Sequence, residues 1–245
     1  MRGRRGLTVP QPPDAIGNDW RHFSSIATSR RSYKQPFANK DVSPSIVERC
    51  IDLARWAPSA HNAQPWRFMP FYRQNERHQA LKTRVLDAMA STYADDLTRG
   101  GTDPRQAAEA AIARNAKFRD APVLLLAFMD ASVLDTYPDE RRANAETTMG
   151  IQSTAAALTT LLLAFHAAGL GACWYCAPLF AQGLIEGILH VPGSWHAQAF
   201  VGAGYKAGES PLDEQKGGRM PGSSRFPVSK IAVDPCCFLD ISDRK

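Results

Sequence analysis

The sequence predicts a single α+β domain, and three observations lead to this prediction. The chain has 245 residues, 44% of them hydrophobic, which is enough for a sizeable core. No internal repeat, low-complexity tract or linker interrupts residues 20–205. Helical and strand patterns follow each other with several helices per strand, which favours α+β over a regular βαβ array. The composition excludes a disordered or fibrous protein.

The first half of the chain predicts four helices and one strand. Helices are expected over residues 18–27, from 44 to no further than Pro58, over 75–97 and over 104–119. The expected N-caps of the last three are Ser43, Asn75 and Asp103. Residues 57–65 then form a loop, and residues 66–72 predict a strand. Pro70 places this strand at a sheet edge, because proline has no N–H to donate to a second neighbour.

The second half begins with PVLLLAF at residues 122–128, a continuous apolar run typical of a strand buried on both faces. A long helix over 139–168, closed by Gly169, a strand over 172–177, a helix over 179–189 and a strand over 197–205 follow. The most apolar stretch, 155–173, is interrupted by threonines, a histidine and glycines. It therefore predicts a buried helix, and we expect no membrane partner.

The positive charge of the chain is concentrated near its beginning. The net charge is +5, and residues 1–35 alone contain seven basic and two acidic residues, so the rest is balanced. No basic face for nucleic acid is therefore expected on the body. Residues 1–19, which lack the apolar region of a secretory signal, predict a disordered basic tail, residues 20–207 the domain, and residues 208–245 a C-terminal arm. Five cysteines without regular spacing favour a reducing, cytoplasmic location.

Residues 30–34 read RRSYK and place three cations and a hydroxyl within five residues. Guanidinium groups bind phosphate through paired hydrogen bonds, and an ammonium and a hydroxyl add further contacts. The cluster predicts a phosphate site, with a solvated basic turn as the alternative.

Residues 57–66 read APSAHNAQPW, between a predicted helix and a predicted strand. Asn and Gln side chains carry both a donor and an acceptor and match the imide edge of a flavin or pyrimidine. Such residues also form turns by bonding to their own backbone. Spacing alone leaves both interpretations open.

Four signatures in order resemble the FMN-dependent nitroreductase superfamily: RRSYK, APSAHNAQPWRF, APVLLLAF and, after a long small-residue helix, GLGACW. The resemblance covers residues 24–205. The segments GLGACW, VPGSW and VGAGY look most like the nitroreductase-like domain of the enzyme that completes the deazaflavin coenzyme. The resemblance implies a central, mostly antiparallel sheet flanked by helices, in an intertwined homodimer with FMN at the subunit interface.

The resemblance also implies the cofactor contacts. The segment that holds the phosphate, the ribityl chain and the pyrimidine edge corresponds to Arg30, Arg31, Ser32 and Lys34. The loop that reaches the flavin from the other subunit corresponds to Pro58, Ser59, Ala60 and Asn62. The ring edge and the stretch near N5 correspond to Asn115, Tyr175, Cys176 and Ala177. A late phosphate contact is assigned to Arg225, in preference to Arg219, because an apolar segment follows it.

His61 and Trp174 are the candidates for the substrate side of this site. Cys173 and Cys176 have the spacing of a redox dithiol or half a zinc site. In a strand, however, residues three apart point to opposite faces, which favours structural cysteines. We expect no metal site and no catalytic side chain, because bound FMN carries the chemistry.

The expected activity is that of an FMN-dependent oxidoreductase. It would take hydride from NAD(P)H and reduce a nitroaromatic, a quinone or another conjugated small molecule by a ping-pong mechanism. The alternatives are a flavoprotein of cofactor biosynthesis, acting in deazaflavin precursor reduction or dimethylbenzimidazole synthesis, and a non-catalytic flavin-binding module.

Overall fold

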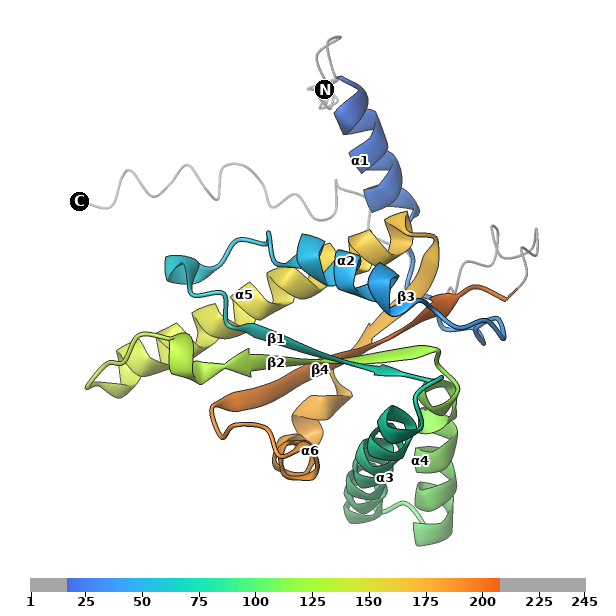
Figure 1. Ribbon diagram of the computed structural model, residues 1–245. Helices are drawn as coiled ribbons and strands as arrows, with labels where there is room; N and C mark the ends of the chain where they lie inside the picture. The colour runs from blue at the N-terminus through green and yellow to red at the C-terminus, as the bar shows by residue number, and fades with distance from the viewer. Residues whose placement is uncertain (1–16, 208–245) are drawn as a thin grey trace, which may run out of the picture. The chain divides into compact units, whose positions relative to one another are not determined.

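The structure is a computed structural model that describes residues 17–207, and its centre is a four-stranded antiparallel sheet (Figure 1). The strand order is β1–β2–β4–β3, and neighbouring strands are antiparallel throughout. The strands are β1 (Trp66–Tyr72), β2 (Val123–Asp130), β3 (Leu170–Tyr175) and β4 (Trp195–Tyr205). The predicted α+β class and antiparallel sheet are confirmed.

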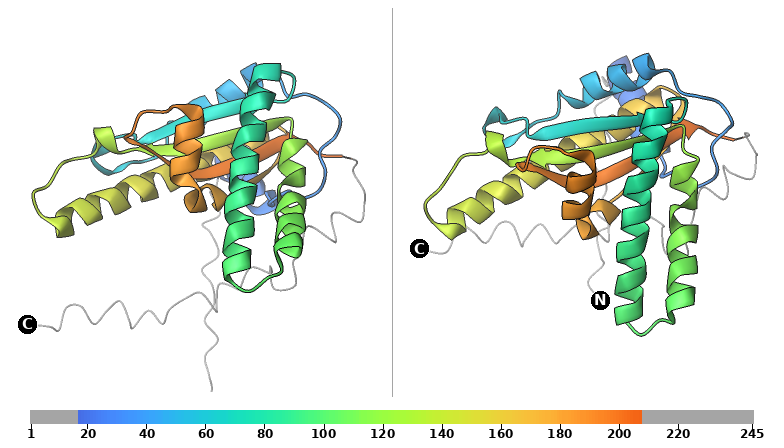
Figure 2. Two further views of the ribbon diagram at one scale, coloured as in Figure 1. Left: turned by 90° about the horizontal axis from the view of Figure 1, so that it is seen from below. Right: turned by 60° about the horizontal axis from the view of Figure 1, so that its bottom comes forward.

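Six α-helices and three short 3-10 turns accompany the sheet within the described residues. The helices are α1 (Asn18–Ser29), α2 (Pro44–Ala54), α3 (Glu76–Arg99), α4 (Pro104–Arg119), α5 (Glu140–Ala167) and α6 (Gln182–Leu189). The turns are η1 (Ala60–Asn62), η2 (Ala131–Val133) and η3 (Ala177–Phe180). Figure 2 shows α3 and α4 side by side, on the face of the sheet opposite to α5.

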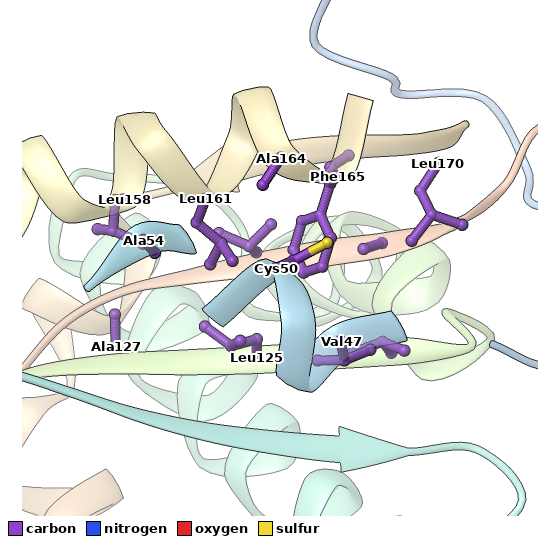
Figure 3. Packing of buried hydrophobic residues seen from close by; sticks show 14 of the residues in the cluster. Val47, Cys50, Ala54, Leu125, Ala127, Leu158, Leu161, Ala164, Phe165 and Leu170 are labelled. Carbon is purple, nitrogen blue, oxygen red and sulfur yellow. The ribbon is translucent and has the colours of Figure 1, made fainter. Parts of the chain in front are cut away.

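The side chains of β2 alternate between two hydrophobic cores, one on each face of the sheet. Leu125 and Ala127 face α2 and α5, where Phe165 and Leu161 complete the packing (Figure 3). Leu124, Leu126 and Phe128 face the opposite core, to which α3, α4 and α6 contribute. All eight residues of β2 are buried, which confirms the prediction of a strand covered on both faces.

Helix α5 is, by length and composition, long and apolar enough to cross a membrane, and it is the only such helix among residues 17–207. One face of it, with Ala157, Leu158, Leu161 and Phe165, is buried in the core that covers the sheet. It ends before Gly169, whose φ of +77° suits a residue without a β-carbon. The prediction of a buried helix over this apolar stretch is confirmed.

Local signals explain most element boundaries, and two features depart from expectation. Asn75 and Asp103 accept hydrogen bonds from the first turns of α3 and α4, as predicted. The Ser43 hydroxyl instead lies 2.8 Å from the Ser45 hydroxyl and caps no backbone N–H. Helix α2 ends at Ala54, within the predicted limit at Pro58, and the N–H groups of Trp56 and Ala57 continue it as a looser turn. Residues 177–180 form η3, not the end of a strand and the start of a helix, since a proline occupies its second position.

Two predicted segments fall largely outside the described residues. The C-terminal arm, with Arg225 and Arg219, lies there, as does the basic tail up to residue 16. Helix α1 begins at Asn18, so the last two residues assigned to the tail belong to a helix.

Candidate functional site

The basic segment after α1 runs along the edge strand β3 and the end of β4. The N–H of Tyr33 donates to the carbonyl oxygen of Ala172 at 2.9 Å, and Ser32 forms an isolated parallel bridge with the same residue. Further along, the N–H of Ala38 donates to the carbonyl oxygen of Tyr205 at 2.8 Å. The sheet thus holds the backbone of this segment in place, while Arg31 Nη1 donates to the carbonyl oxygens of Thr28 and Arg30.

Cations gather where α1, α5 and the end of β4 meet. His166 near the end of α5 lies 2.8 Å from the hydroxyl of Ser29. Burial lowers the pKa of His166, and the positive charges of Lys206, Arg30 and Arg31 lower it further. Three cations therefore act on His166, and their combined field favours an anion at this place. Lys206 was missed by sequence reasoning because it follows a strand that is distant in the chain from the RRSYK motif.

Further along the segment, Lys34 lines a small hollow of about 10 Å³. Tyr33, Phe118, Cys173 and Tyr175 are among the residues that line it. The ring of Tyr175 packs edge-on against Phe118, with ring centroids 4.6 Å apart. Burial, together with a hydrogen bond involving Cys173, raises the pKa of the Tyr175 hydroxyl well above its ordinary value, so the phenol stays neutral. Two predicted cofactor residues, Lys34 and Tyr175, thus meet at one hollow.

A larger cleft of about 250 Å³ lies between α3, α4 and the turn η3, somewhat smaller than a typical small-molecule site. Asn115 and Ala177, two more predicted cofactor residues, line it together with Met89, Tyr93, Asp96, Arg114, Phe180 and Ala181. Asn115 is 4% exposed, and its Nδ2 donates to the carbonyl oxygen of Leu86 at 2.8 Å. Part of the hydrogen-bonding capacity of this amide is thus used to join α4 to α3.

The loop that carries Pro58, Ser59, Ala60 and Asn62 folds into the turn η1 and rests on α5. The N–H of Ala60 donates to the hydroxyl of Ser153 at 3.2 Å, and the hydroxyl of Ser59 accepts from the N–H of Gln64 at 3.1 Å. His61, Asn62 and Gln64 have φ near +50°, which non-glycine residues adopt rarely. The turn interpretation of this loop holds for Ser59, while Pro58 and Asn62 are exposed and their contact with a flavin stays a prediction.

The two predicted halves of the cofactor site lie at opposite ends of the sheet. Trp66 pairs with Met129, and Met129 pairs with His196 near the start of β4, so the loop lies at that end. Leu170 pairs with Tyr205 at the other end, where the basic segment lies. The 11 residues of β4 separate these ends by roughly 30–35 Å, given about 3.4 Å per residue. One chain therefore does not bring Ser32 and Asn62 to a common ligand.

The remaining candidates are Trp174, Cys173 and Cys176 at the end of β3, and His61 in η1. Trp174 packs against the α2 and α5 core, on the face opposite to Tyr175. Cys173 is buried, and Cys176 is exposed just after the strand ends. His61 is exposed in η1 and faces α5, where Glu146 Oε2 lies 3.8 Å from its Nε2.

A polar cluster that sequence reasoning missed joins β1, β2 and β4 at the loop end of the sheet. Asp130, 4% exposed, lies with Oδ2 2.8 Å from Arg67 Nη2. Its Oδ1 accepts from the hydroxyls of Ser132 at 2.6 Å and Ser194 at 2.9 Å. Burial raises the pKa of Asp130, but the bonds from Ser132 and Ser194 and the charge of Arg67 outweigh burial and lower it overall. This cluster supports the loop end of the sheet structurally.

Comparisons with known proteins agree with these signatures. The family model described as the Nitroreductase family matches residues 27–205. The 5,6-dimethylbenzimidazole synthase of Rhodospirillum rubrum is 29% identical over 206 residues, which cover 78% of this chain and 84% of that protein. Among solved structures, a BluB-like flavoprotein from Clostridium difficile 630 superposes with a TM-score of 0.65 at 22% identity, over 86% of this chain and 97% of the other. Iodotyrosine deiodinase bound to FMN and 3-iodo-L-tyrosine gives a TM-score of 0.56 at 21% identity, over 84% and 98%.

Proposed function

Because the chain belongs to the nitroreductase family, we propose that it is an FMN-dependent oxidoreductase. It would use NAD(P)H to reduce a nitroaromatic, a quinone or another conjugated small molecule by a ping-pong mechanism. The observation that carries the proposal is that Arg30, Arg31 and Lys206 act together on His166, on the same segment whose Lys34 lines the hollow beside Tyr175.

The donor set of this region fits FMN. A phosphate monoester needs cations and hydroxyl or N–H donors, and Arg30, Arg31 and Ser32 offer them on a backbone held by β3. The C-terminal end of α1 carries a partial negative charge, so the attraction for the phosphate has to come from these cations. Aromatic Tyr175 in the hollow and small Ala177 in the larger cleft would suit the flat ring system, and Lys34, which lines the hollow with Tyr175, would supply positive charge at a ring edge.

The predicted loop contacts require a second copy of the chain. Pro58, Ser59, Ala60 and Asn62 lie at the opposite end of the sheet from Arg30 and Ser32, so a site that contains both sets joins two subunits. Apolar side chains near the loop support such an interface. Trp56, two residues before Pro58, is 86% exposed in the single chain. We therefore propose a homodimer with FMN between the subunits.

Bound FMN would accept hydride from NAD(P)H and donate it to the oxidant. The protein's own residues would bind the cofactor and orient it. The arginines and Ser32 anchor the phosphate, Lys34 supplies a positive charge near the pyrimidine edge, and the neutral phenol of Tyr175 keeps the inner wall of the hollow free of charge. The cleft of about 250 Å³ beside Asn115 would offer space for part of a small planar substrate. We place the enzyme in the cytoplasm on its composition and cysteine usage.

A second candidate function has support from one comparison. The relative from Rhodospirillum rubrum is a 5,6-dimethylbenzimidazole synthase. The same fold and site would then serve cofactor biosynthesis, either in dimethylbenzimidazole synthesis or in the reduction of a deazaflavin precursor. A third candidate is a flavin-binding module without turnover.

The test begins with the purified full-length protein. We expect a yellow protein that releases FMN, identified by mass, and oxidises NADH or NADPH with a quinone or nitroarene as acceptor. Double-reciprocal plots at several acceptor concentrations should be parallel, as a ping-pong mechanism requires. Formation of dimethylbenzimidazole from reduced FMN and oxygen, without quinone turnover, would favour the second candidate. A colourless protein that does not bind added FMN would refute both.

A further inference from the structure

Three side chains from separate segments converge where the loop of η1 meets α5. His61 comes from η1, Asp135 from the segment between η2 and α5, and Glu146 from the second turn of α5. Their ligand atoms all lie within 4.8 Å of one another. Among residues 17–207 this is the only group of three His, Cys, Asp or Glu side chains that meets this distance.

Glu146 is the unusual member of the group. Its side chain is 3% exposed, and its Oε2 is buried without a hydrogen-bond partner. Its Oε1 accepts one long bond, 3.4 Å, from the N–H of Asp135. Burying a carboxylate oxygen without a partner is costly, and a second carboxylate nearby adds repulsion. The unpartnered oxygen lies 3.8 Å from His61 Nε2, so it is aimed into the cluster.

From this geometry we propose that His61, Asp135 and Glu146 bind a divalent first-row transition metal ion of the Zn²⁺ type. One imidazole and two carboxylates are ligands that Zn²⁺, Mn²⁺ and Fe²⁺ accept, whereas Mg²⁺ and Ca²⁺ prefer oxygen ligands alone. The ion would supply the positive charge and the partner that Glu146 Oε2 lacks. Three protein ligands would leave a further coordination position for water.

The distances require only a small closure of the site. Ligand atoms of a tetrahedral zinc ion lie about 3.4 Å apart, given metal–ligand distances near 2.1 Å. The observed His61–Glu146 separation is 3.8 Å, and no pair exceeds 4.8 Å. His61 and Asp135 are exposed and free to change rotamer, while Glu146 is held by α5. The buried glutamate therefore acts as the fixed ligand.

The ion would tie together segments that are distant in the sequence. At present the turn η1 is held to α5 by the bond from Ala60 N–H to the Ser153 hydroxyl, at 3.2 Å. A metal at His61 adds a second tie one residue away and also fixes the segment before α5. The loop with the three positive φ values would then be clamped at its strained point. Metal binding does not depend on the proposed reaction, so it is testable on the protein with or without flavin.

The test is a metal titration of the full-length protein after chelator treatment. We expect about one Zn²⁺ per chain by calorimetry and elemental analysis, and an increase in Tm on adding Zn²⁺. Mn²⁺, which binds thiolates poorly, should occupy the same site and so separate it from any site built by the cysteines. Mg²⁺ should bind at least tenfold more weakly than either.

Variants of the cluster and one matched control decide the outcome. Glu146→Gln keeps the shape and removes the charge, and Asp135→Asn does the same at an exposed position that does not threaten folding. Each of these and His61→Ala should weaken Zn²⁺ and Mn²⁺ binding at least tenfold. The control is His196→Ala, because His196 Nδ1 lies 3.9 Å from Glu186 Oε1 in a similar pair that lacks a third ligand. Binding that survives Asp135→Asn and His61→Ala, or no binding by the wild type, would overturn the proposal.

Discussion

The ring of Tyr33 lies directly on the backbone of Gly171, where a β-carbon added to the glycine would be 2.7 Å from Tyr33 Cγ. The same tyrosine donates its backbone N–H to Ala172 and its hydroxyl to the carbonyl oxygen of Pro36, at 2.8 Å. Its hydroxyl also accepts from the N–H of Ala207 at 3.0 Å. Tyr33 therefore holds the basic segment against the sheet. Its ring can pack this closely only because residue 171 is a glycine and has no side chain.

We predict that Gly171→Ala displaces this segment and weakens FMN binding. Overpacking of a tight contact costs about 1–3 kcal/mol, so the dissociation constant of FMN should rise about tenfold or more, as measured by fluorescence titration. The control is Gly183→Ala in α6, where an added β-carbon would meet no atom within 4 Å. Equal losses of FMN affinity in both variants would show that the contact between Tyr33 and Gly171 is not what the loss depends on.

Lys34→Met should affect flavin reduction more than flavin binding. The residue lines the hollow beside Tyr175, where its positive charge would stabilise negative charge that develops on reduction. We expect the rate of reduction by NAD(P)H, measured by stopped-flow absorbance, to fall about tenfold, while the dissociation constant of FMN changes less. Lys40→Met is the matched control, because Lys40 Nζ lies 4.1 Å from the centre of the Tyr205 ring and outside the hollow. An unchanged rate in Lys34→Met would contradict this role.

Trp56→Ser should weaken the proposed homodimer. The indole is 86% exposed next to the loop that would reach the partner, and buried tryptophans often dominate interface energies. We expect the dimer dissociation constant to rise at least about tenfold, as followed by sedimentation or light scattering over a dilution series. Ile112→Ser on α4, where the side chain is 62% exposed, provides a comparison on the other face of the sheet. Loss of the dimer in the Ile112 variant alone would place the interface elsewhere.

Lys82 should make stability increase with pH in the alkaline range. The side chain is 1% exposed, and its Nζ donates to the carbonyl oxygens of Arg119 at 2.7 Å and Ala121 at 3.3 Å. Burial lowers its pKa to about 8, and although Asp120 opposes the shift, Arg73 and Arg119 add to it. Between pH 8 and pH 10.5 the unfolded chain therefore binds a proton that the folded chain has lost.

Urea unfolding of the wild type and of Lys82→Met across this range measures the effect. The free energy of unfolding of the wild type should gain on that of the variant, by at most about 1.4 kcal/mol per pH unit. A difference between the two proteins that does not vary with pH would show that Lys82 is not the titrating group.

Asp130 should contribute stability that acid removes. Because the folded-state pKa lies below the unfolded value of about 3.9, the carboxylate stabilises the fold above that value, and the contribution is lost as pH falls through the folded pKa. Asp130→Asn should cost about 1–3 kcal/mol at neutral pH, and the gap to the wild type should narrow below about pH 4. Arg67→Met removes the partner of Asp130 at 2.8 Å. In that background, Asp130→Asn should therefore lower the free energy of unfolding by less than it does in the wild type. If the free energies of unfolding of the wild type and of Asp130→Asn fall in parallel as the pH is lowered, the Asp130 carboxylate is not the group whose protonation removes stability.

Much of the fold was predictable because its signals are local. The apolar run of β2, the caps Asn75 and Asp103, and the position of Pro70 each depend on residues close in sequence, and the structure agrees with all three. The boundary that moved, at η3, depends on how the turn around a proline is completed. Local preference leaves several such turns open.

The cofactor site was predictable only in pieces. The motif RRSYK identifies a cluster because its residues are neighbours in the sequence: Arg30, Arg31, Ser32 and Lys34. The contribution of Lys206 to their electrostatic field, and the distance that separates them from Asn62, follow from strand pairing across β4 and carry no local signal. The assignments of Asn115 and Tyr175 stay predictions, with geometry that places each beside a hollow.

The sequence by itself determined the family, the order of helices and strands, and the cationic segment after α1, because periodicity, caps and charge clusters act over a few residues. Only the tertiary structure decided that Gly171 lies under Tyr33, that Asp130 pairs with Arg67, and that His61 faces Glu146 beside Asp135. These contacts join segments that are far apart in the chain. Packing of the two cores against one sheet selects such contacts, and no short stretch of sequence encodes them.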